Sequence, residues 1–339
     1  MSTRYPLNFT GKGSEYFKIW IVNIALSLIT LGIYSAWAKV RTNRWFYGHT
    51  ILDHQAFVYL ATPMQILKGR LIAAAFFIAY VITSEILPLV GMGILLLILA
   101  LSPWIIVRSL RFNALQSSYR GIRFGFVGSV SGAAKAFLLW PFVSLITLGL
   151  ALPYAAYVQV KYLASNYTYG SVQCLYEGQS KPFWKLYIWV FALVALPLGL
   201  MMLGFFGLMA SSAFEKGARA SLLLVMIVLL YTLVPIAMAI IKTRVANLFY
   251  NHTQMGEARF HSTQRAREML WIYFSNLFLV MVTLGLFTPF ASVRIARYKA
   301  LHLEVIAPDL ESYSAKIQSD VGALGSEMSD FFDMDVGVG

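Results

Sequence analysis

Two asparagines are the residues of this chain best placed to do chemistry in an apolar environment. Asn23 and Asn276 each lie in an apolar stretch, at the same distance before a Thr-Leu-Gly tripeptide. A side-chain amide that enters lipid needs hydrogen-bond partners, so it either holds helices together or lines a polar path. We expect these two intramembrane polar residues to hold helices together, with the lining of a path as the alternative.

Catalysis and cofactor binding have no comparable signal in the chain. The sequence contains no Walker loop, no HExxH, no GxSxG and no dinucleotide fingerprint. Cys174 is the single cysteine, which excludes an intramolecular disulfide and a cysteine metal cluster. No carboxylate or second histidine stands at ligand spacing from the histidines, which are His49, His54, His252, His261 and His302. We therefore predict no enzymatic activity and no catalytic, cofactor-binding or metal-binding residues.

Six arginines follow apolar stretches in pairs and could bind phosphate groups. A guanidinium matches the geometry of a phosphate, and basic residues at the cytoplasmic ends of membrane helices attract anionic lipids. Basic residues beside aromatic ones also occur in nucleic-acid sites, but at the edges of apolar stretches lipid explains them better, so we expect no nucleic-acid partner. The expected contacts of anionic phospholipid head groups are Arg41, Arg44, Arg108, Arg111, Arg294 and Arg297.

The elements that carry these residues are those of a membrane protein. Hydrophobic residues make up 59% of the chain and charged residues 12%, and the mean hydropathy is +0.68. Most apolar runs reach the roughly 17–25 residues that a helix needs to cross hydrocarbon. The seven runs are Trp20–Ala38, Leu71–Leu87, Leu89–Val107, Ala136–Val160, Leu186–Ala213, Ala220–Ile241 and Leu270–Ala291. This pattern predicts an all-α polytopic membrane protein in contact with the lipid bilayer.

The tripeptide Thr-Leu-Gly occurs three times, each time in an apolar run that ends in basic residues. Short polar stretches between the runs carry turn-prone pairs flanked by β-prone residues, which predict small cytoplasmic β-hairpins at the helix junctions. The turns are expected at Asp53-His54, Arg120-Gly121, Gly170-Ser171 and Gly256-Glu257. The pattern indicates two and a half internal repeats, at about residues 9–125, 126–262 and 263–307, in a single membrane domain of residues 1–307.

The basic residues also bear on how the Thr-Leu-Gly segments meet the membrane. If all seven runs cross once, basic clusters lie on both sides, against the positive-inside rule. If these segments instead re-enter on one face, nearly all of the 27 basic residues lie on that face. Gly32, Gly149 and Gly285 would supply the sharp turns, because glycine adopts angles that other residues avoid. A larger side chain there would also meet a packed neighbour. Three kinked, ordinary spanning helices are the alternative.

Residues 308–339 differ from the rest of the chain. Seven of the fifteen acids lie there, opposed only by Lys316. Low hydrophobicity together with an excess of one charge is typical of disordered segments. We expect residues 308–339 to form an acidic, disordered tail.

The chain resembles the YjgN-like family of bacterial inner-membrane proteins. The resemblance rests on Phe9-Thr10-Gly11, Glu15-Tyr16-Phe17, Trp20, Asn23, Thr30-Leu31-Gly32-Ile33-Tyr34 and Trp37-Ala38-Lys39-Val40-Arg41, and it extends to about residue 307. It implies a multi-pass protein of the bacterial inner (cytoplasmic) membrane. It implies no activity, substrate or catalytic residue, and the acidic tail is not part of the pattern.

Two functions remain open from the sequence. Duplicated helices, the paired asparagines and re-entrant segments favour a transporter or channel for a small solute or lipid. The missing substrate signature and the acidic tail favour a membrane scaffold or adaptor that partners another envelope protein. A continuous polar path through the protein would favour transport, and a solid apolar core with an exposed cytoplasmic platform would favour the scaffold.

Overall fold

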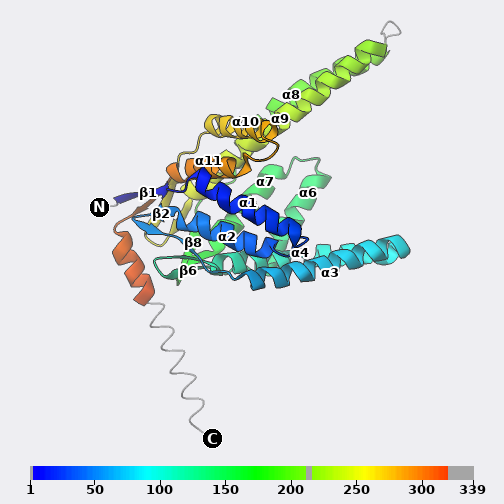
Figure 1. The fold of residues 1–339 in the computed structure, drawn as a ribbon. Coiled ribbons are helices and arrows are strands. Elements are labelled where there is room, and N and C mark those ends of the chain that lie inside the picture. Colours follow the sequence, from blue (N-terminus) through cyan, green and yellow to red (C-terminus); the bar gives the residue numbers. More distant parts are fainter. Residues whose placement is uncertain (1–2, 211–215, 320–339) are drawn as a thin grey trace.

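The computed structural model describes residues 3–210 and 216–319, in which pairs of helices alternate with short strands (Figure 1). The strands are β1 (Thr3–Phe9), β2 (Thr50–Leu52), β3 (Gln55–Ala56), β4 (Val58–Tyr59), β5 (Ser117–Tyr119), β6 (Ile122–Phe126), β7 (Tyr167–Tyr169), β8 (Val172–Tyr176), β9 (Thr253–Met255), β10 (Ala258–Ser262) and β11 (Leu303–Ala307). The helices are α1 (Gly13–Ile29), α2 (Ser35–Gly48), α3 (Pro63–Ile86), α4 (Pro88–Leu115), α5 (Val130–Ala134), the π-helical turn η1 (Lys135–Leu139), α6 (Trp140–Ile146), α7 (Leu152–Asn166), α8 (Lys181–Ala210), α9 (Lys216–Asn251), α10 (Ala266–Val282) and α11 (Thr288–Leu301).

The described strands form one eleven-stranded antiparallel sheet in the order β3-β2-β1-β11-β10-β9-β8-β7-β6-β5-β4. The first strand pairs with the last, with Thr3 opposite Ala307. The strands at the two ends of the sheet, β3 and β4, are separated in the chain by Phe57 alone. The sheet therefore returns on itself as a nearly closed ring, which we call the strand ring.

The prediction of an all-α protein was wrong in this respect, although the fold is mostly helical. The four predicted hairpins exist, but they do not stand alone at the helix junctions. A two-stranded hairpin is marginal in water and has two unpaired edges. The hairpins satisfy these edges by pairing with one another and with β1, β4 and β11, three strands that sequence patterning does not predict.

The turns of the four hairpins lie where the sequence predicts them. Each contains backbone angles in the left-handed region, which glycine and, less often, Asp, Asn or His adopt. The positive φ angles are 44° at Asp53, 59° at His54, 47° at Arg120, 79° at Gly121, 57° at Gly170 and 58° at Gly256.

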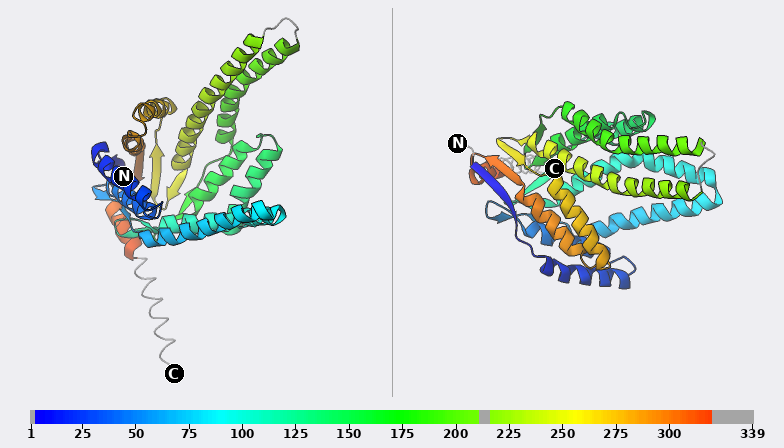
Figure 2. Two further views of the ribbon diagram at one scale, coloured as in Figure 1. Left: turned by 45° about the vertical axis from the view of Figure 1, so that its right-hand side comes forward. Right: turned by 90° about the horizontal axis from the view of Figure 1, so that it is seen from above.

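Four of the described helices are long and apolar enough to cross a membrane: Pro63–Ile86, Pro88–Leu115, Lys181–Gly204 and Leu224–Asn251. They form two pairs, α3 with α4 and α8 with α9, that extend well beyond the shorter helices, and Figure 2 shows the helices leaving the strand ring toward one side. Between 6% and 17% of their apolar windows is buried inside the chain. The rest of their surface is apolar, so lipid or another apolar partner must cover it.

The other three apolar runs are each divided in two at the Thr-Leu-Gly tripeptide. In all three, the glycine N–H bonds to the carbonyl five residues earlier, at 2.7 Å for Gly32, 2.7 Å for Gly149 and 2.8 Å for Gly285. The preceding leucine N–H bonds to the carbonyl three residues earlier. This is the Schellman pattern that ends a helix. The threonine hydroxyl then accepts the N–H of the fourth residue after it, at the start of the next helix.

The expected turns are therefore present as backbone geometry, with φ of 90°, 91° and 94° at Gly32, Gly149 and Gly285. The expectation of a packed neighbour was wrong. No atom lies within 4 Å of a Cβ built at Gly32 or Gly285, and Leu152 Cδ1 lies 3.4 Å away at Gly149. The three turns are tips, and the leucines before the glycines, Leu31, Leu148 and Leu284, are 95%, 92% and 94% exposed.

The expectation of a disordered tail was also wrong for its first part. Residues 310–319 form a helix, seen in Figure 1 beside the strand ring and away from the helical pairs. Leu310 and Ile317 are 5% and 2% exposed, and they pack with ring residues such as Leu52, Tyr119 and Val305 in one apolar cluster. The remainder of the tail, residues 320–339, lies outside the described residues. We call residues 310–319 the capping helix.

Replacing Gly32, Gly149 or Gly285 by alanine should destabilise the protein by about 1 kcal/mol, because a Cβ is disfavoured at these positive φ angles. Gly69, in the interior of α3 with open space around it, is the matched control. There alanine should be neutral or stabilise by about 1 kcal/mol, since it favours helix. Melting temperatures in detergent make the comparison. A raised melting temperature in all three turn variants would contradict the turn geometry.

Candidate functional site

The six predicted lipid-binding arginines lie on α2, α4 and α11. Arg44, Arg111 and Arg297 lie near the helix ends that lead into strands, and the other three lie one turn earlier, which is the middle of α2 and of α11. Three donate hydrogen bonds to backbone carbonyls and so fasten helices to the strand ring or to its connections. The pairs are Arg44 Nη2 with Ala61 O at 3.2 Å, Arg111 Nε with Phe126 O at 3.3 Å and Arg297 Nη2 with Gly11 O at 2.9 Å. Arg41 and Arg108 are exposed and make no hydrogen bond within the described residues. These two remain the freest to contact lipid.

The sixth arginine binds one of the two asparagines. Arg294 Nη1 donates to Asn276 Oδ1 at 2.7 Å, and the Asn276 amide donates to the Ala291 carbonyl at 3.4 Å. Asn276 is 5% exposed, and it joins α10 to α11. Through these bonds Asn276 contacts both the backbone and a side chain of α11.

Asn23 occupies the corresponding place between α1 and α2 and is incompletely bonded. Its Nδ2 lies 3.5 Å from both the Ala38 carbonyl and the Thr42 hydroxyl. Its Oδ1 is buried without a hydrogen-bond partner among the described residues. Arg41 stands where Arg294 stands in the other pair, but its side chain does not reach Asn23. The two asparagines thus have the same position and different partners, and neither lines a cavity described below.

Three of the five histidines end helices in the same way. His49, His252 and His302 each place Nδ1 near the carbonyl four residues earlier, at 2.7, 3.1 and 2.9 Å. They therefore complete the last turn of α2, α9 and α11. Within the described residues, no group of three or more His, Cys, Asp or Glu side chains is arranged to hold a metal ion.

A cavity of about 500 Å³ lies where the ends of α2, α4, α7 and α9 meet the strand ring. We call it the vestibule. Its wall combines aromatic rings with polar side chains, among them Asn113, Ser117, Thr168 and Thr253. Cys174 also faces it, and burial raises the pKa of this thiol to about 11. The thiol is therefore protonated near pH 7 and is a weak nucleophile.

A second cavity, of about 140 Å³, lies inside the strand ring and is lined mainly by apolar side chains. We call it the inner cavity. The capping helix closes it with Leu310, Tyr313 and Ser314. The Tyr313 hydroxyl donates to the Met255 carbonyl at 2.6 Å, which ties the capping helix to β9. Burial raises the pKa of Tyr313 to about 12, so this phenol stays a donor at physiological pH.

Four side chains line both cavities and separate them: Phe57, Phe124, Met255 and Phe260. We call them the septum. The rings of Phe57 and Phe124 stack with centroids 6.3 Å apart. No charged side chain lines either cavity within the described residues. Since an ion would find no counter-charge there, the arrangement suits an uncharged or amphipathic solute.

The septum and both cavities escaped sequence reasoning. The alternation of Ile122, Phe124 and Phe126 in β6, and of Ala258, Phe260 and Ser262 in β10, is a period-2 signal that places Phe124 and Phe260 on a defined face of each strand. That signal could have identified them as inward residues. Phe57 had no such signal, because its place follows from closure of the ring.

Comparisons with known proteins identify relatives but no function. The family described as "Bacterial protein of unknown function (DUF898)" matches residues 4–331. A protein of Salmonella typhimurium named "Inner membrane protein YjgN" is 34% identical over 152 residues, which cover 44% of this chain and 38% of the relative. The protein of the same name from Escherichia coli K12 is 33% identical over 159 residues, covering 47% and 39%. The match thus spans well under half the length of these relatives. No solved structure matches the chain.

Arg294→Ala should lower the free energy of unfolding by about 1–3 kcal/mol, because it leaves the buried Asn276 Oδ1 without its donor. Arg41→Ala is the matched control at the corresponding place, and it should change stability little, since Arg41 bonds to no described residue. Thermal unfolding in one detergent measures both. If the two variants lose the same amount of stability, the Arg294–Asn276 hydrogen bond does not stabilise the α10–α11 pair more than Arg41 stabilises the α1–α2 pair.

Proposed function

This chain belongs to the DUF898 family, and on that premise we propose that it is a multi-pass protein of the bacterial inner membrane that passes a small uncharged or amphipathic solute along the axis of the strand ring. The relatives are named inner membrane proteins. Four described helices have the length and composition of membrane spans.

The observation that carries the proposal is the series formed by the vestibule, the septum and the inner cavity. The vestibule, at about 500 Å³, falls within the roughly 300–1,000 Å³ of small-molecule sites. The septum is apolar, and apolar constrictions gate aqueous pores by excluding water. The capping helix stands at the far end, so the described state is closed at two points.

The membrane topology we propose has four spans and three re-entrant segments. The spans are the α3–α4 and α8–α9 pairs, and the re-entrant segments are the three pairs of shorter helices that turn at Thr-Leu-Gly. The exposed leucines at those turns favour tips that end inside the hydrocarbon, since water would not solvate them well. The strand ring then lies on the cytoplasmic side, beside the basic helix ends.

The shared geometry of the three turns also supports internal repetition. Leu31, Leu148 and Leu284 have φ of 49°, 50° and 49°, which is uncommon for leucine. Three independent origins of this same uncommon turn are less economical than duplication of one unit. We propose that the helix pairs and hairpins arose by such duplication.

A scaffold or adaptor remains the second candidate, and one observation favours it. The spanning windows are at most 17% buried within the chain, which leaves long apolar faces free for another membrane protein. The apolar cluster inside the ring would then be an ordinary core. The two candidates differ in whether the septum controls a flux.

Single cysteines at His54, Ser171 and Glu257, in a Cys174→Ser background, should all be protected from an impermeant thiol reagent in intact cells. These residues are exposed in the turns of three hairpins, and the proposed topology places them all in the cytoplasm. Leu89→Cys, at the far end of the α3–α4 pair and 80% exposed, should label from outside. Labelling of one turn alone in intact cells would exclude the re-entrant topology.

The double variant F124A/F260A should let glycerol cross proteoliposome membranes faster than the wild-type protein does, because it widens the septum. Leu175→Ala, at a position on β8 that is 54% exposed and lines neither cavity, should behave as wild type. Osmotic swelling followed by light scattering gives the rates, and melting temperatures confirm folding. If a folded double variant passes no more glycerol than the control, the scaffold function is favoured and the conduit is excluded.

A further inference from the structure

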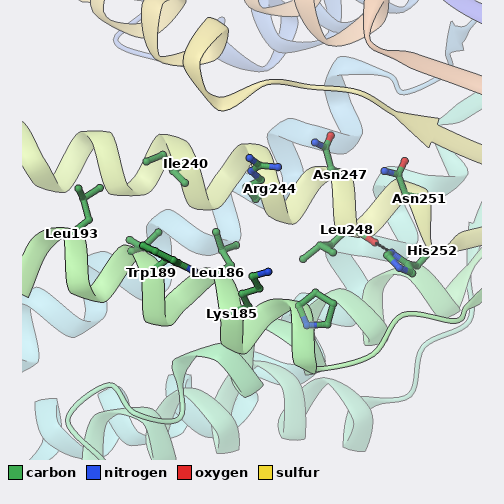
Figure 3. A pocket seen from close by; sticks show the side chains of 12 residues that line it. Lys185, Leu186, Trp189, Leu193, Ile240, Arg244, Asn247, Leu248, Asn251 and His252 are labelled. Carbon is green, nitrogen blue, oxygen red and sulfur yellow. Dashed lines mark hydrogen bonds between the residues drawn. The ribbon is translucent and has the colours of Figure 1, made fainter.

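A groove of about 600 Å³ runs along α8 and α9, outside the strand ring and separate from the vestibule (Figure 3). On each of the two helices, side chains that line the groove recur at every fourth position. The lining residues of each helix therefore lie on one face of that helix. On α8 these are Lys185, Trp189 and Leu193, and on α9 they are Ile240, Arg244 and Leu248, with His252 directly after the end of α9.

The groove has a basic end and an apolar end. Because α8 leaves the ring and α9 returns to it, Lys185 and Arg244 lie nearer the ring than Leu193 and Ile240 do. From Lys185 to Leu193, α8 rises about 12 Å at 1.5 Å per residue. Trp189 lies between the two ends, and its ring suits the boundary between head groups and hydrocarbon.

The basic end is not neutralised by the protein. Lys185 and Arg244 are exposed, and neither makes a hydrogen bond or ion pair within the described residues. No described Asp or Glu lines the groove. The neighbouring amides are occupied, because Asn247 bonds to Ser262 and to Gln264, and Asn251 bonds to Ser262. Two unpaired cations therefore face the same opening.

We propose that this groove binds one anionic phospholipid of the cytoplasmic leaflet, with its phosphate between Lys185 and Arg244 and an acyl chain along Trp189, Leu193 and Ile240. A free phosphate would use only the basic end and leave the apolar wall uncovered. A zwitterionic lipid has no net charge and would bring its own positive group next to Lys185 and Arg244, whereas an anionic lipid compensates part of their charge. The site is distinct from the septum, and lipid binding there does not depend on transport.

Native mass spectrometry of the full chain, released from micelles holding equal amounts of phosphatidylglycerol and phosphatidylcholine, tests the proposal. The wild-type protein should retain phosphatidylglycerol preferentially. The variant K185Q/R244Q should lower that preference by roughly thirtyfold, the scale expected when two basic residues of about 1 kcal/mol each are removed. The control K181Q/K242Q removes two exposed lysines of the same helices that do not line the groove, and it should keep the preference.

Two further arms identify the ligand. Inorganic phosphate at millimolar concentration should not displace the bound lipid, and Trp189→Ala should weaken retention although it removes no charge. Displacement by phosphate would assign the basic end to a soluble anion and overturn the lipid site. If K181Q/K242Q loses the preference for phosphatidylglycerol to the same extent, general surface charge explains lipid retention. That result would also overturn the proposed lipid site. If K185Q/R244Q fails to fold, Lys185→Gln alone carries the test, since this exposed side chain has no partner to lose.

Discussion

Backbone pairing around the strand ring is the constraint on which the other elements depend. Except for β3 and β4, every strand has a neighbour on both sides, so its N–H and C=O groups are satisfied within the sheet. Each helical pair begins and ends at strands of this ring. The spacing of the helix ends is therefore set by the spacing of strands. The vestibule exists because those helix ends stand around a ring instead of converging on one point.

The ring also explains which residues sequence patterning could and could not place. Local signals were sufficient for the hairpin turns and for the glycine turns, because a turn depends on a few neighbouring φ angles. The pairing of Thr3 with Ala307 is a contact across the whole described chain, and no local pattern encodes it. Phe57 illustrates the result: it is one residue of a short polar stretch in sequence, and a member of the septum once the ring closes.

The charged residues show a similar division. Clustering at the ends of apolar runs places Arg44, Arg111 and Arg297 near helix ends, but it does not reveal their partners. Arg44 and Arg111 bond to carbonyls 17 and 15 residues further along the chain, and Arg297 bonds to one that lies 286 residues earlier. The capping helix was misjudged for a related reason. Its acidic side chains suggested disorder, whereas Leu310 and Ile317, seven positions apart, supply the single apolar face that the ring mouth requires.

The pairing of β1 with β11 has a consequence for how the protein is made. A ribosome releases β1 first and β11 some three hundred residues later, which at about 5–20 residues per second takes on the order of tens of seconds. Through that interval β1 can pair on one side with β2, while its other edge is open. Helical hairpins have local contacts and can enter the membrane as they emerge. Insertion of the helices therefore precedes completion of the ring, and the nascent chain carries an unpaired strand edge for nearly the whole of its synthesis.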